Sequence, residues 1–420
     1  MERAKIRKIV TITEDTLTEM GRDIPPPTRR AAAVAVIQNP FAGRYVEDLE
    51  PLMEIGAELG GLLGDKAVAA LGITPAEAQS YGKAALVGEN GELEHAAAIL
   101  HPKLGAPLRV AVEEAHAQDA EILICLRAAG WKGAPPWEEF FMSEFYEAHP
   151  EWRCVDYDGT PTMHMSYAAE EVQDHLLDVY REVLQRDPDG AGFMFHRGMP
   201  MMLWEEPFCK RFVQKFGEDP RKLAEDDPRV FEMRAEIVTS FMRKIRTLLD
   251  ETAKKQGRAD HRLKLAVTTF ATAADNRKFG IDVETWIEEK LVDQIGIAWF
   301  AYYTSGLKTK SGDTAYYARI TEGTDVKTYP FYVGWKMNSA SDLLSKVAVN
   351  YDDGADGIAV WDPNQFVGWQ SGKNPYWPLI SKLGHRQNVR AGSLLYKPIA
   401  TPLTRLGNNH YSRWHPNTGF

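Results

Sequence analysis

From residue 113 onward the chain alternates between segments with a helical spacing of apolar residues and short runs that are apolar throughout. The helical segments are 169–184, 228–256, 283–290 and 340–351, after a helix that ends near Asp119. The apolar runs are Glu121 to Leu126, Gly190 to His196, Leu263 to Phe270, Gln294 to Phe300, Val326 to Trp335 and Gly357 to Trp361. Apolar strands separated by helices are typical of a parallel sheet that is buried on both faces. The sequence therefore predicts an α/β fold.

Six βα units can be recognised in this alternation when they are counted by their strands. A series of this length favours a closed (β/α)₈ barrel, the TIM-like fold, which contains eight such units. The two missing strands have candidates upstream, in the apolar runs Ala31 to Ile37 and Ala84 to Gly88. The N-terminal region either completes the barrel with these strands or forms a small separate α/β domain.

The N-terminal region also differs from the rest of the chain in composition, since all 11 tryptophans lie between Trp131 and Trp414. Within this region we expect a strand at Lys5 to Thr13 and a long helix at 47–71, separated by a loop that contains three consecutive prolines. The expected organisation has three parts. They are an N-terminal α/β region (1–112), the barrel (113–400) and a C-terminal tail (401–420).

Charge and cysteine usage narrow the classes of function. The 420 residues include 49 Lys and Arg against 59 Asp and Glu, a net charge of −10, which argues against nucleic acid as a partner. Cys125, Cys154 and Cys209 are odd in number and far apart, so neither a disulfide framework nor a zinc site is expected. A reducing, cytoplasmic compartment agrees best with this usage.

Membrane segments and cofactor motifs are not expected either. No window approaches about 18 consecutive apolar residues, and the first residues lack the pattern of a signal peptide. The turn Gly88 to Gly91 lacks the Lys and Ser/Thr of a phosphate-binding loop, and the spacing of His95 and His101 is wrong for a helical pair of metal ligands. We therefore expect no membrane partner, no cofactor and no metal, and a structural or interaction role for the N-terminal region.

Four stretches of the second region carry a family resemblance. They are 149–184, which begins HPEWRCVDYDG, 189–208, 216–251 and 279–295. Together with the strand pattern, they make residues 113–395 similar to the glycoside-hydrolase-like (β/α)₈ barrels related to family 10, a group of hypothetical glycosyl hydrolases. The resemblance implies carbohydrate hydrolysis.

The first region resembles a different family, the uncharacterised amino acid synthesis proteins, which are α/β proteins. The stretches that carry this resemblance are 6–16, 29–52 and 81–109, so that it covers residues 1–111. Each resemblance is truncated at the junction near residue 112. This common junction suggests a fusion of parts of two families.

Paired carboxylates at the carboxyl ends of strands are the groups that most glycoside hydrolases use. Asp362 directly follows the last apolar run and is the first candidate, with an Asx-turn before Pro363 as the alternative. Glu205 or Glu206 can supply the second carboxylate. The alternative for these two is a helix N-terminus, because Pro207 suits the first turn of a helix.

The run Gly190 to His196 ends without the acidic residue that related barrels carry there. His196 can act as a general acid or base instead, and Arg197 can bind a hydroxyl group or a carboxylated sugar. A structural role at the rim of the barrel is the alternative for both. Asp275 is a weaker carboxylate candidate, since it can simply cap a helix.

Aromatic rings stack on the apolar faces of sugars, and several aromatic residues follow predicted strand ends. The expected substrate-binding residues are the aromatic residues Trp131, Trp204, Trp299, Tyr302, Trp335 and Trp361 and the polar residues Arg127, His164, Tyr167 and Asn364. Core packing and hydrogen bonding within loops are the alternatives.

Three functions remain open at this point. The first is an enzyme that hydrolyses glycosidic bonds with Asp362 and Glu205 or Glu206 as its carboxylate pair. The second is a degenerate barrel that binds carbohydrate without cleaving it, and the third is a small-molecule enzyme that uses His196 as its acid or base. In each case the expected partner is a carbohydrate or another small molecule, and the sequence leaves a homo-oligomer open.

Overall fold

The structure is a computed structural model of the 420-residue chain. It describes residues 8–11, 112, 116, 121–128, 131, 144–224, 226–258, 262–298, 313–333, 340–361, 383–384, 386–390, 403–406 and 409–412. The chain forms two compact units. The first consists of Met1–Ile122, Phe331–Asp352 and Gly357–Phe420, and the second of Leu123–Pro330 and Asp353–Asp356.

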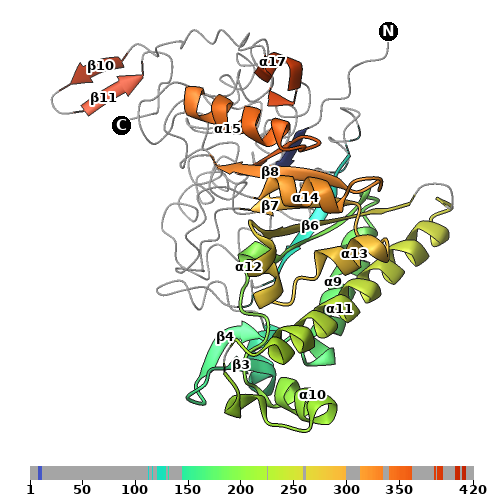
Figure 1. The fold of residues 1–420 in the computed structure, drawn as a ribbon. Helices are drawn as coiled ribbons and strands as arrows, with labels where there is room; N and C mark the ends of the chain where they lie inside the picture. The colour runs from blue at the N-terminus through green and yellow to red at the C-terminus, as the bar shows by residue number, and fades with distance from the viewer. Residues whose placement is uncertain are drawn as a thin grey trace, which may run out of the picture. The chain divides into compact units, whose positions relative to one another are not determined.

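The second unit is built on a parallel sheet (Figure 1). Every neighbouring pair of its strands is parallel. The strands, in their order across the sheet, are β2 (Leu123–Arg127), β5 (Gly190–Met194), β6 (Lys264–Phe270), β7 (Gln294–Ala298) and β8 (Lys327–Val333). The predicted α/β fold is confirmed, because each of these strands lies within a predicted apolar run or overlaps it closely.

A helix precedes each of the strands β5 to β8. These helices are α9 (Glu170–Leu184), α11 (Pro228–Lys255), α13 (Val283–Glu288) and α14 (Thr314–Ile320). The first three lie on the same side of the sheet in Figure 1. The first three were expected from the spacing of apolar residues, whereas α14 was not, since its seven residues are too short to show a helical period.

The longest helix, α11, has clear start and stop signals in the sequence. Asp227 caps it by accepting a hydrogen bond from the backbone N–H of Arg229 at 2.9 Å, and Pro228 occupies its first turn. Lys254 and Lys255 in the last turn favour the negative end of the helix dipole. Within the part of the chain that the structure describes, neither this helix nor any other is long and apolar enough to cross a membrane.

Aromatic packing joins the helices to one face of the sheet. The Phe193 ring of β5 lies 5.5 Å from the ring of Phe241 in α11, and the Phe195 ring stacks on Trp286 of α13 at 5.2 Å. All four side chains are fully buried. On the same face, the Tyr317 hydroxyl group of α14 lies 2.8 Å from Thr269 Oγ1 of β6. We call this the helix face of the sheet.

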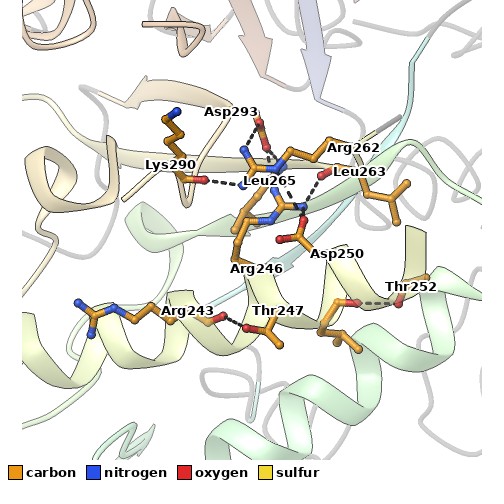
Figure 2. Close-up of polar contacts among 11 residues, drawn as sticks. Arg243, Arg246, Thr247, Asp250, Thr252, Arg262, Leu263, Leu265, Lys290 and Asp293 are labelled. Carbon is orange, nitrogen blue, oxygen red and sulfur yellow. Dashed lines mark hydrogen bonds and ion pairs between the residues drawn. The ribbon is translucent and has the colours of Figure 1, made fainter. Parts of the chain in front are cut away.

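A cluster of ion pairs ties α11 to the amino ends of β6 and β7 (Figure 2). Asp293, directly before β7, accepts hydrogen bonds from Arg246 Nη1 at 3.0 Å and from the backbone N–H of Leu265 at 2.7 Å. Arg246 also donates to the carbonyl oxygen of Leu263 at 2.6 Å and lies 2.9 Å from Asp250. In (β/α)₈ barrels, residues at the amino ends of the strands serve stability, whereas ligands bind at the carboxyl ends.

A two-stranded hairpin extends the second unit between β2 and α9. Its strands β3 (Arg153–Val155) and β4 (Pro161–Met165) are antiparallel and follow α8 (Glu144–Ala148). The short helix α10 (Glu206–Phe216) comes after β5, and the backbone N–H of Trp204, just before α10, donates to the carbonyl oxygen of Val155 at 2.9 Å. This bond joins the hairpin to the loop that precedes α10.

The first unit contains parallel strands of its own. β9 (Ile358–Trp361) pairs with the end of β8 and with β1 (Lys8–Thr11), and α15 (Ala340–Asp352) precedes it. The unit also includes α17 (Arg386–Arg390) and an antiparallel hairpin of β10 (Leu403–Leu406) and β11 (Asn409–Ser412). The strand expected at Lys5 to Thr13 is therefore confirmed as β1.

The closed barrel remains a prediction. Seven parallel strands lie in the described part of the chain, whereas a (β/α)₈ barrel has eight. In the described part of the N-terminal region, β1 forms a parallel pair with β9. The runs 31–37 and 84–88 and the helix expected at 47–71 lie outside the described residues.

Candidate functional site

A histidine and a threonine meet at the carboxyl ends of β5 and β6. β5 ends at Met194, and the 3₁₀ turn η3 (Phe195–Arg197) carries His196 beyond it. Met194 is in register with Thr268 of β6, and His196 Nδ1 lies 2.5 Å from Thr268 Oγ1. His196 is only 1% exposed and Thr268 is 7% exposed. Ligands of parallel α/β folds bind at the carboxyl ends of the strands, so this pair is the first candidate for function.

The pair lies on the sheet face opposite the helix face. Side chains alternate between the two faces along a strand. Thr269 contacts Tyr317 of α14 on the helix face, so its neighbour Thr268 lies on the other side. Phe195 stacks on Trp286 on the helix face, whereas the next residue, His196, contacts Thr268. We call the face that carries Thr268 the open face, because several of its side chains remain half-buried.

A row of residues crosses the open face in register with Thr268. From β2 to β8 the row contains Arg127, Met194, Thr268, Gly296 and Tyr329. Arg127 and Tyr329 are half-buried. Neighbouring strands are about 4.8 Å apart, so the Cα atoms of Arg127 and Thr268 lie roughly 10 Å apart on either side of Met194. A guanidinium, a hydroxyl and a phenol in one row offer hydrogen bonds to a polar ligand.

Glu205 is a buried carboxyl group that holds three segments together. Its Oε1 accepts a hydrogen bond of 2.5 Å from Ser166 Oγ, and its Oε2 accepts from the backbone N–H groups of Leu203 at 2.9 Å and Val155 at 3.3 Å. Burial raises the pKa of Glu205, although these three hydrogen bonds act in the opposite direction. The residue occupies the N-cap position of α10, which is the structural alternative that the sequence indicated.

Glu205 therefore has one property of a general acid and lacks another. A raised pKa favours the protonated form of a carboxyl group, which is the form that donates a proton to a leaving group. Both oxygens of Glu205, however, already accept hydrogen bonds from donors of the same chain. A catalytic role for Glu205 remains a prediction, and Glu206, which is exposed, lies in the first turn of α10.

Two of the tryptophans proposed for sugar binding lie among other rings. Trp204 is 5% exposed and meets the ring of Tyr157 edge to face, with 4.7 Å between the centroids. Trp131 is 6% exposed, and its ring centroid lies 5.8 Å from those of Phe145 and His175. These contacts are those of core residues, and sugar stacking by either ring remains a prediction.

Three further candidates lie away from the His196 and Thr268 pair. Tyr167 is fully buried on the helix face, and its hydroxyl group donates to the carbonyl oxygen of Ala128 at 2.8 Å. His164 lies in β4 of the hairpin, where burial lowers its pKa. Asp275 lies in α12 (Ala273–Lys278), and it accepts a hydrogen bond of 2.6 Å from Thr272, the N-cap residue of this helix. Of the proposed polar residues, only Arg127 lies on the same sheet face as His196 within the described ranges.

Several proposed site residues lie outside the described residues. They are Asp362, Asn364, Trp299, Tyr302 and Trp335, as are the turn at 88–91 and the pair His95 and His101. Trp361 is the last residue of β9 and Arg197 the last of η3, and for both the description covers the backbone. The roles proposed for these residues remain predictions.

The cysteines do not form a reactive or metal-binding group within the described residues. All three are free thiols. Burial raises the pKa of Cys125 to about 12 and that of Cys209 to about 11, so both thiols keep their protons at neutral pH. The described part of the chain contains no group of three His, Cys, Asp or Glu side chains that could hold a metal ion.

Sequence reasoning missed Thr268 and Tyr329. Thr268 is followed by a second threonine, so the alternation of polar and apolar residues does not reveal which of the two threonines lies on the open face. Tyr329 lies in an aromatic-rich strand, Lys327–Val333, where a phenol is easily taken for core. The signal that identifies both is register, which depends on how distant strands pair.

The comparison with protein families finds a match in the N-terminal region. Residues 6–122 match the model of a family described as Amino acid synthesis. This match confirms the resemblance expected for that region. Because the segment is less than half of the chain, it describes the segment and not the whole protein. A comparison with curated proteins gives no match.

Among solved structures, the chain is similar to the crystal structure of a noncanonic maltogenic alpha-amylase AmyB from Thermotoga neapolitana. The identity is 12% over 66% of this chain, and the TM-score is 0.35. The chain spans 58% of the length of that protein. A likeness of this size carries no inference about activity.

Proposed function

We propose that this protein is an enzyme that acts on a carbohydrate at the open face of the sheet, with His196 as its general acid or base. The observation that carries the proposal is the 2.5 Å contact between His196 Nδ1 and Thr268 Oγ1 at the carboxyl ends of two neighbouring parallel strands. This is the end of a parallel sheet at which barrel enzymes carry their catalytic groups.

The contact with Thr268 gives His196 a fixed orientation. A hydrogen bond at one ring nitrogen sets the tautomer of an imidazole and the direction of the other nitrogen, here Nε2. A positioned imidazole of this kind accelerates proton transfer by about 10²- to 10⁴-fold. Thr268 therefore acts as a positioning residue for His196, which is the group that exchanges a proton with the substrate.

Carbohydrate is the substrate class that the resemblance of residues 113–395 favours. In the hydrolysis of a glycosidic bond, His196 gives its proton to the leaving oxygen as the bond to the anomeric carbon breaks. Water adds to that carbon and releases a proton to solvent. Hydroxyl groups of a sugar pair well with the guanidinium of Arg127 and the phenol of Tyr329, which lie in one row of the open face.

The second candidate function is a barrel that binds carbohydrate without cleaving it. The observation in its favour is that both oxygens of Glu205, one of the two candidates for the second carboxylate, accept hydrogen bonds from Ser166, Leu203 and Val155. A hydrolase of the usual kind needs two carboxyl groups that reach the substrate. If Glu205 serves only to hold the hairpin, Glu206 is the remaining candidate for the second carboxylate, and without it the pair is incomplete.

The test is a screen of 4-nitrophenyl glycosides of neutral and acidic sugars, followed by variants on any substrate that is cleaved. We expect His196→Gln to lower kcat/KM by about 10²- to 10⁴-fold. Thr268→Val should lower kcat less and change the pH profile, because it leaves the imidazole in place but removes its hydroxyl partner. The matched control is His149→Gln, a half-buried histidine beside Trp152, which should leave turnover unchanged.

Each result of the screen decides between the candidates. Loss of activity in His196→Gln but not in His149→Gln supports the proposal that the protein is an enzyme that uses His196. Equal activity in His196→Gln and the wild type contradicts this proposal. Binding of sugars in a calorimeter without release of nitrophenol supports the second candidate. Asp362→Asn and Glu205→Gln test the carboxylate pair, since full activity in both variants would exclude these two residues as its members.

A further inference from the structure

The open face carries positive charge and no negative charge on its strands. The strand residues of β2, β5, β6 and β7 and the part of β8 in the second unit, Lys327–Pro330, include no Asp or Glu. They do include three cationic residues, Arg127, Lys264 and Lys327. This composition contrasts with the whole chain, which has a net charge of −10.

Register places all three cations on the same face as Thr268. Arg127 is in the row of Thr268 through Met194. Lys264 lies four residues before Thr268 in the same strand, an even step, and so shares its face. Lys327 is in register with Gln294, which is in register with Ala266, two residues before Thr268. The helix face of these strands, by contrast, carries apolar residues and threonines.

Arg127 is the cation of this face that lies nearest the proposed catalytic pair. It is the last residue of β2, at the carboxyl end, and Met194 alone separates it from Thr268 in the row. Lys264 is about 13 Å from Thr268 along β6, at roughly 3.3 Å per residue. Lys327 also lies toward the amino end of its strand, and its Nζ is 3.4 Å from Asp356 Oδ1.

We infer that the substrate carries an anionic group, a carboxylate or a phosphate, and that Arg127 recognises it. The inference rests on the proposed function, because it names the substrate of the His196 site. A guanidinium matches both kinds of oxyanion through two parallel hydrogen bonds. In a protein of net charge −10, an anion needs a local cation of this kind to approach the sheet.

The Cα atoms of Arg127 and Thr268 lie roughly 10 Å apart, and this distance limits the size of the substrate that can contact both residues. The side chain of arginine is long enough to reach part of the way across Met194 toward His196. One sugar ring bearing an acidic group can then place its anion at Arg127 and its glycosidic oxygen near His196. The substrate class is a glycoside of a sugar acid or of a phosphorylated sugar.

The experiment compares three substrates that differ only at carbon 6 of the sugar. They are 4-nitrophenyl glucoside, glucuronide and 6-phosphoglucoside, each in both anomeric forms. We expect kcat/KM of the wild type to be at least about tenfold higher for one of the acidic substrates than for the neutral glucoside. Whether the glucuronide or the 6-phosphoglucoside is preferred shows whether the anionic group is a carboxylate or a phosphate. Arg127→Met should lower kcat/KM for the acidic substrate by about 10- to 100-fold, the loss of a charged hydrogen bond, and should lower kcat/KM for the neutral glucoside by clearly less, so that the preference for the acidic substrate is lost.

Two controls separate recognition from folding. Arg127→Lys keeps the charge and should restore part of the preference, and its melting temperature shows whether the strand tolerates the change. Arg243→Met removes an exposed arginine of α11 that pairs with Glu289, and it should not alter the preference. The preference should also weaken at high ionic strength, because salt screens a partly exposed charge.

The failure of this inference can be told from the failure of the proposed function. If the wild type prefers the neutral glucoside, or if Arg127→Met lowers all three activities equally, the inference is wrong while the enzyme stands. If no glycoside is cleaved, the proposed function is wrong, and calorimetry with glucose, glucuronate and glucose 6-phosphate decides the inference by itself. Equal binding of all three by the wild type and Arg127→Met would then overturn it.

Discussion

Ser166 Oγ donates a hydrogen bond of 2.5 Å to Glu205 Oε1 across 39 residues of sequence. The bond joins the end of the β3–β4 hairpin to the start of α10, and the N–H groups of Val155 and Leu203 complete the contacts of the same carboxyl group. A buried carboxyl group with three donors acts as a structural node. Replacing it by a group without an acceptor removes the partner of the buried Ser166 hydroxyl group and of two part-buried N–H groups, which is costly.

The first prediction is that Glu205→Ala lowers the free energy of unfolding by about 2–4 kcal/mol, the cost of leaving buried donors without an acceptor. The matched control is Glu206→Ala, the next residue, which is exposed and should cost no more than about 0.5 kcal/mol. Urea denaturation followed by circular dichroism measures both. Similar losses in the two variants would show that the three bonds of Glu205 do not contribute to stability.

Glu205→Gln tests the pH dependence that the raised pKa of Glu205 implies. Because the pKa is higher in the folded than in the unfolded protein, the native state holds the proton more tightly. The stability that this proton provides is complete below the pKa of an unfolded glutamate, about 4.3, and is lost as the pH rises through the folded value. Glutamine does not titrate and keeps an oxygen for Leu203 and Val155.

We therefore expect Glu205→Gln to melt at or above the temperature of the wild type at pH 8, with a difference that shrinks as the pH falls to 5. Thermal melts at several pH values measure this difference. A deficit of the variant that grows with pH would mean that the ionised carboxylate itself stabilises the fold.

Asp293 gives a third prediction, at the opposite end of the sheet (Figure 2). Asp293→Ala removes the acceptor of both Arg246 and the Leu265 N–H. The Arg246 side chain is 6% exposed, so a buried charge loses one of its two acidic partners and keeps Asp250, and we expect a loss of about 2–4 kcal/mol in the free energy of unfolding. Arg262→Ala is the control, because the Arg262 side chain is 41% exposed and should cost less than about 1 kcal/mol. Equal losses would contradict the importance of burial in this cluster.

The strands of the parallel sheet and the helices α9, α11, α13 and α15 could be predicted from the sequence because each has a local cause, whereas the β3–β4 hairpin was not expected. Apolar runs mark the buried strands, and Asp227 with Pro228 marks the start of α11. α14 was missed because seven residues give little periodicity. The candidate site was predicted in part. His196 was found from its place after β5, but its partner Thr268 depends on the pairing of β5 with β6, 72 residues away in the chain, which no local pattern encodes.

Glu205 is a second case in which contacts between distant residues decide the role of a side chain. Its neighbour Pro207 indicated a helix N-terminus, and α10 does begin there. Its carboxyl group accepts hydrogen bonds from Val155 and Ser166, which are 50 and 39 residues away in the chain. Burial of this kind is a property of the folded chain, so sequence reasoning could offer both a catalytic and a structural role without a basis for choosing between them.

A fourth prediction concerns Tyr317, whose hydroxyl group lies in a buried network at the carboxyl end of β6. It lies 2.5 Å from the carbonyl oxygen of Phe270 and 2.5 Å from Asn276 Nδ2. Tyr317→Phe removes one hydrogen-bond partner from each of these buried groups, and we expect a loss of about 1–3 kcal/mol in the free energy of unfolding. Tyr316→Phe is the control, because the Tyr316 hydroxyl group bonds only to Glu284 among the described contacts, at 3.1 Å on the surface. A loss in Tyr316→Phe as large as that in Tyr317→Phe would contradict the role of this network.

The last prediction tests the contact of β2 with β5 below the row of Arg127 and Met194. A Cβ atom added to Gly192 would lie 2.1 Å from Cys125 Sγ, a distance that no pair of unbonded atoms tolerates, so Gly192→Ala must push the strands apart or displace the thiol. We expect it to lower the free energy of unfolding by about 1–3 kcal/mol, as overpacking of a core does. Cys125→Ala removes the sulfur atom and should recover most of that loss in the double variant, although the Cys125 Cβ at 3.2 Å remains close. A double-mutant cycle in urea measures the coupling between the two positions. Additive losses would mean that Gly192 is required for its backbone rather than for the space that it leaves to Cys125.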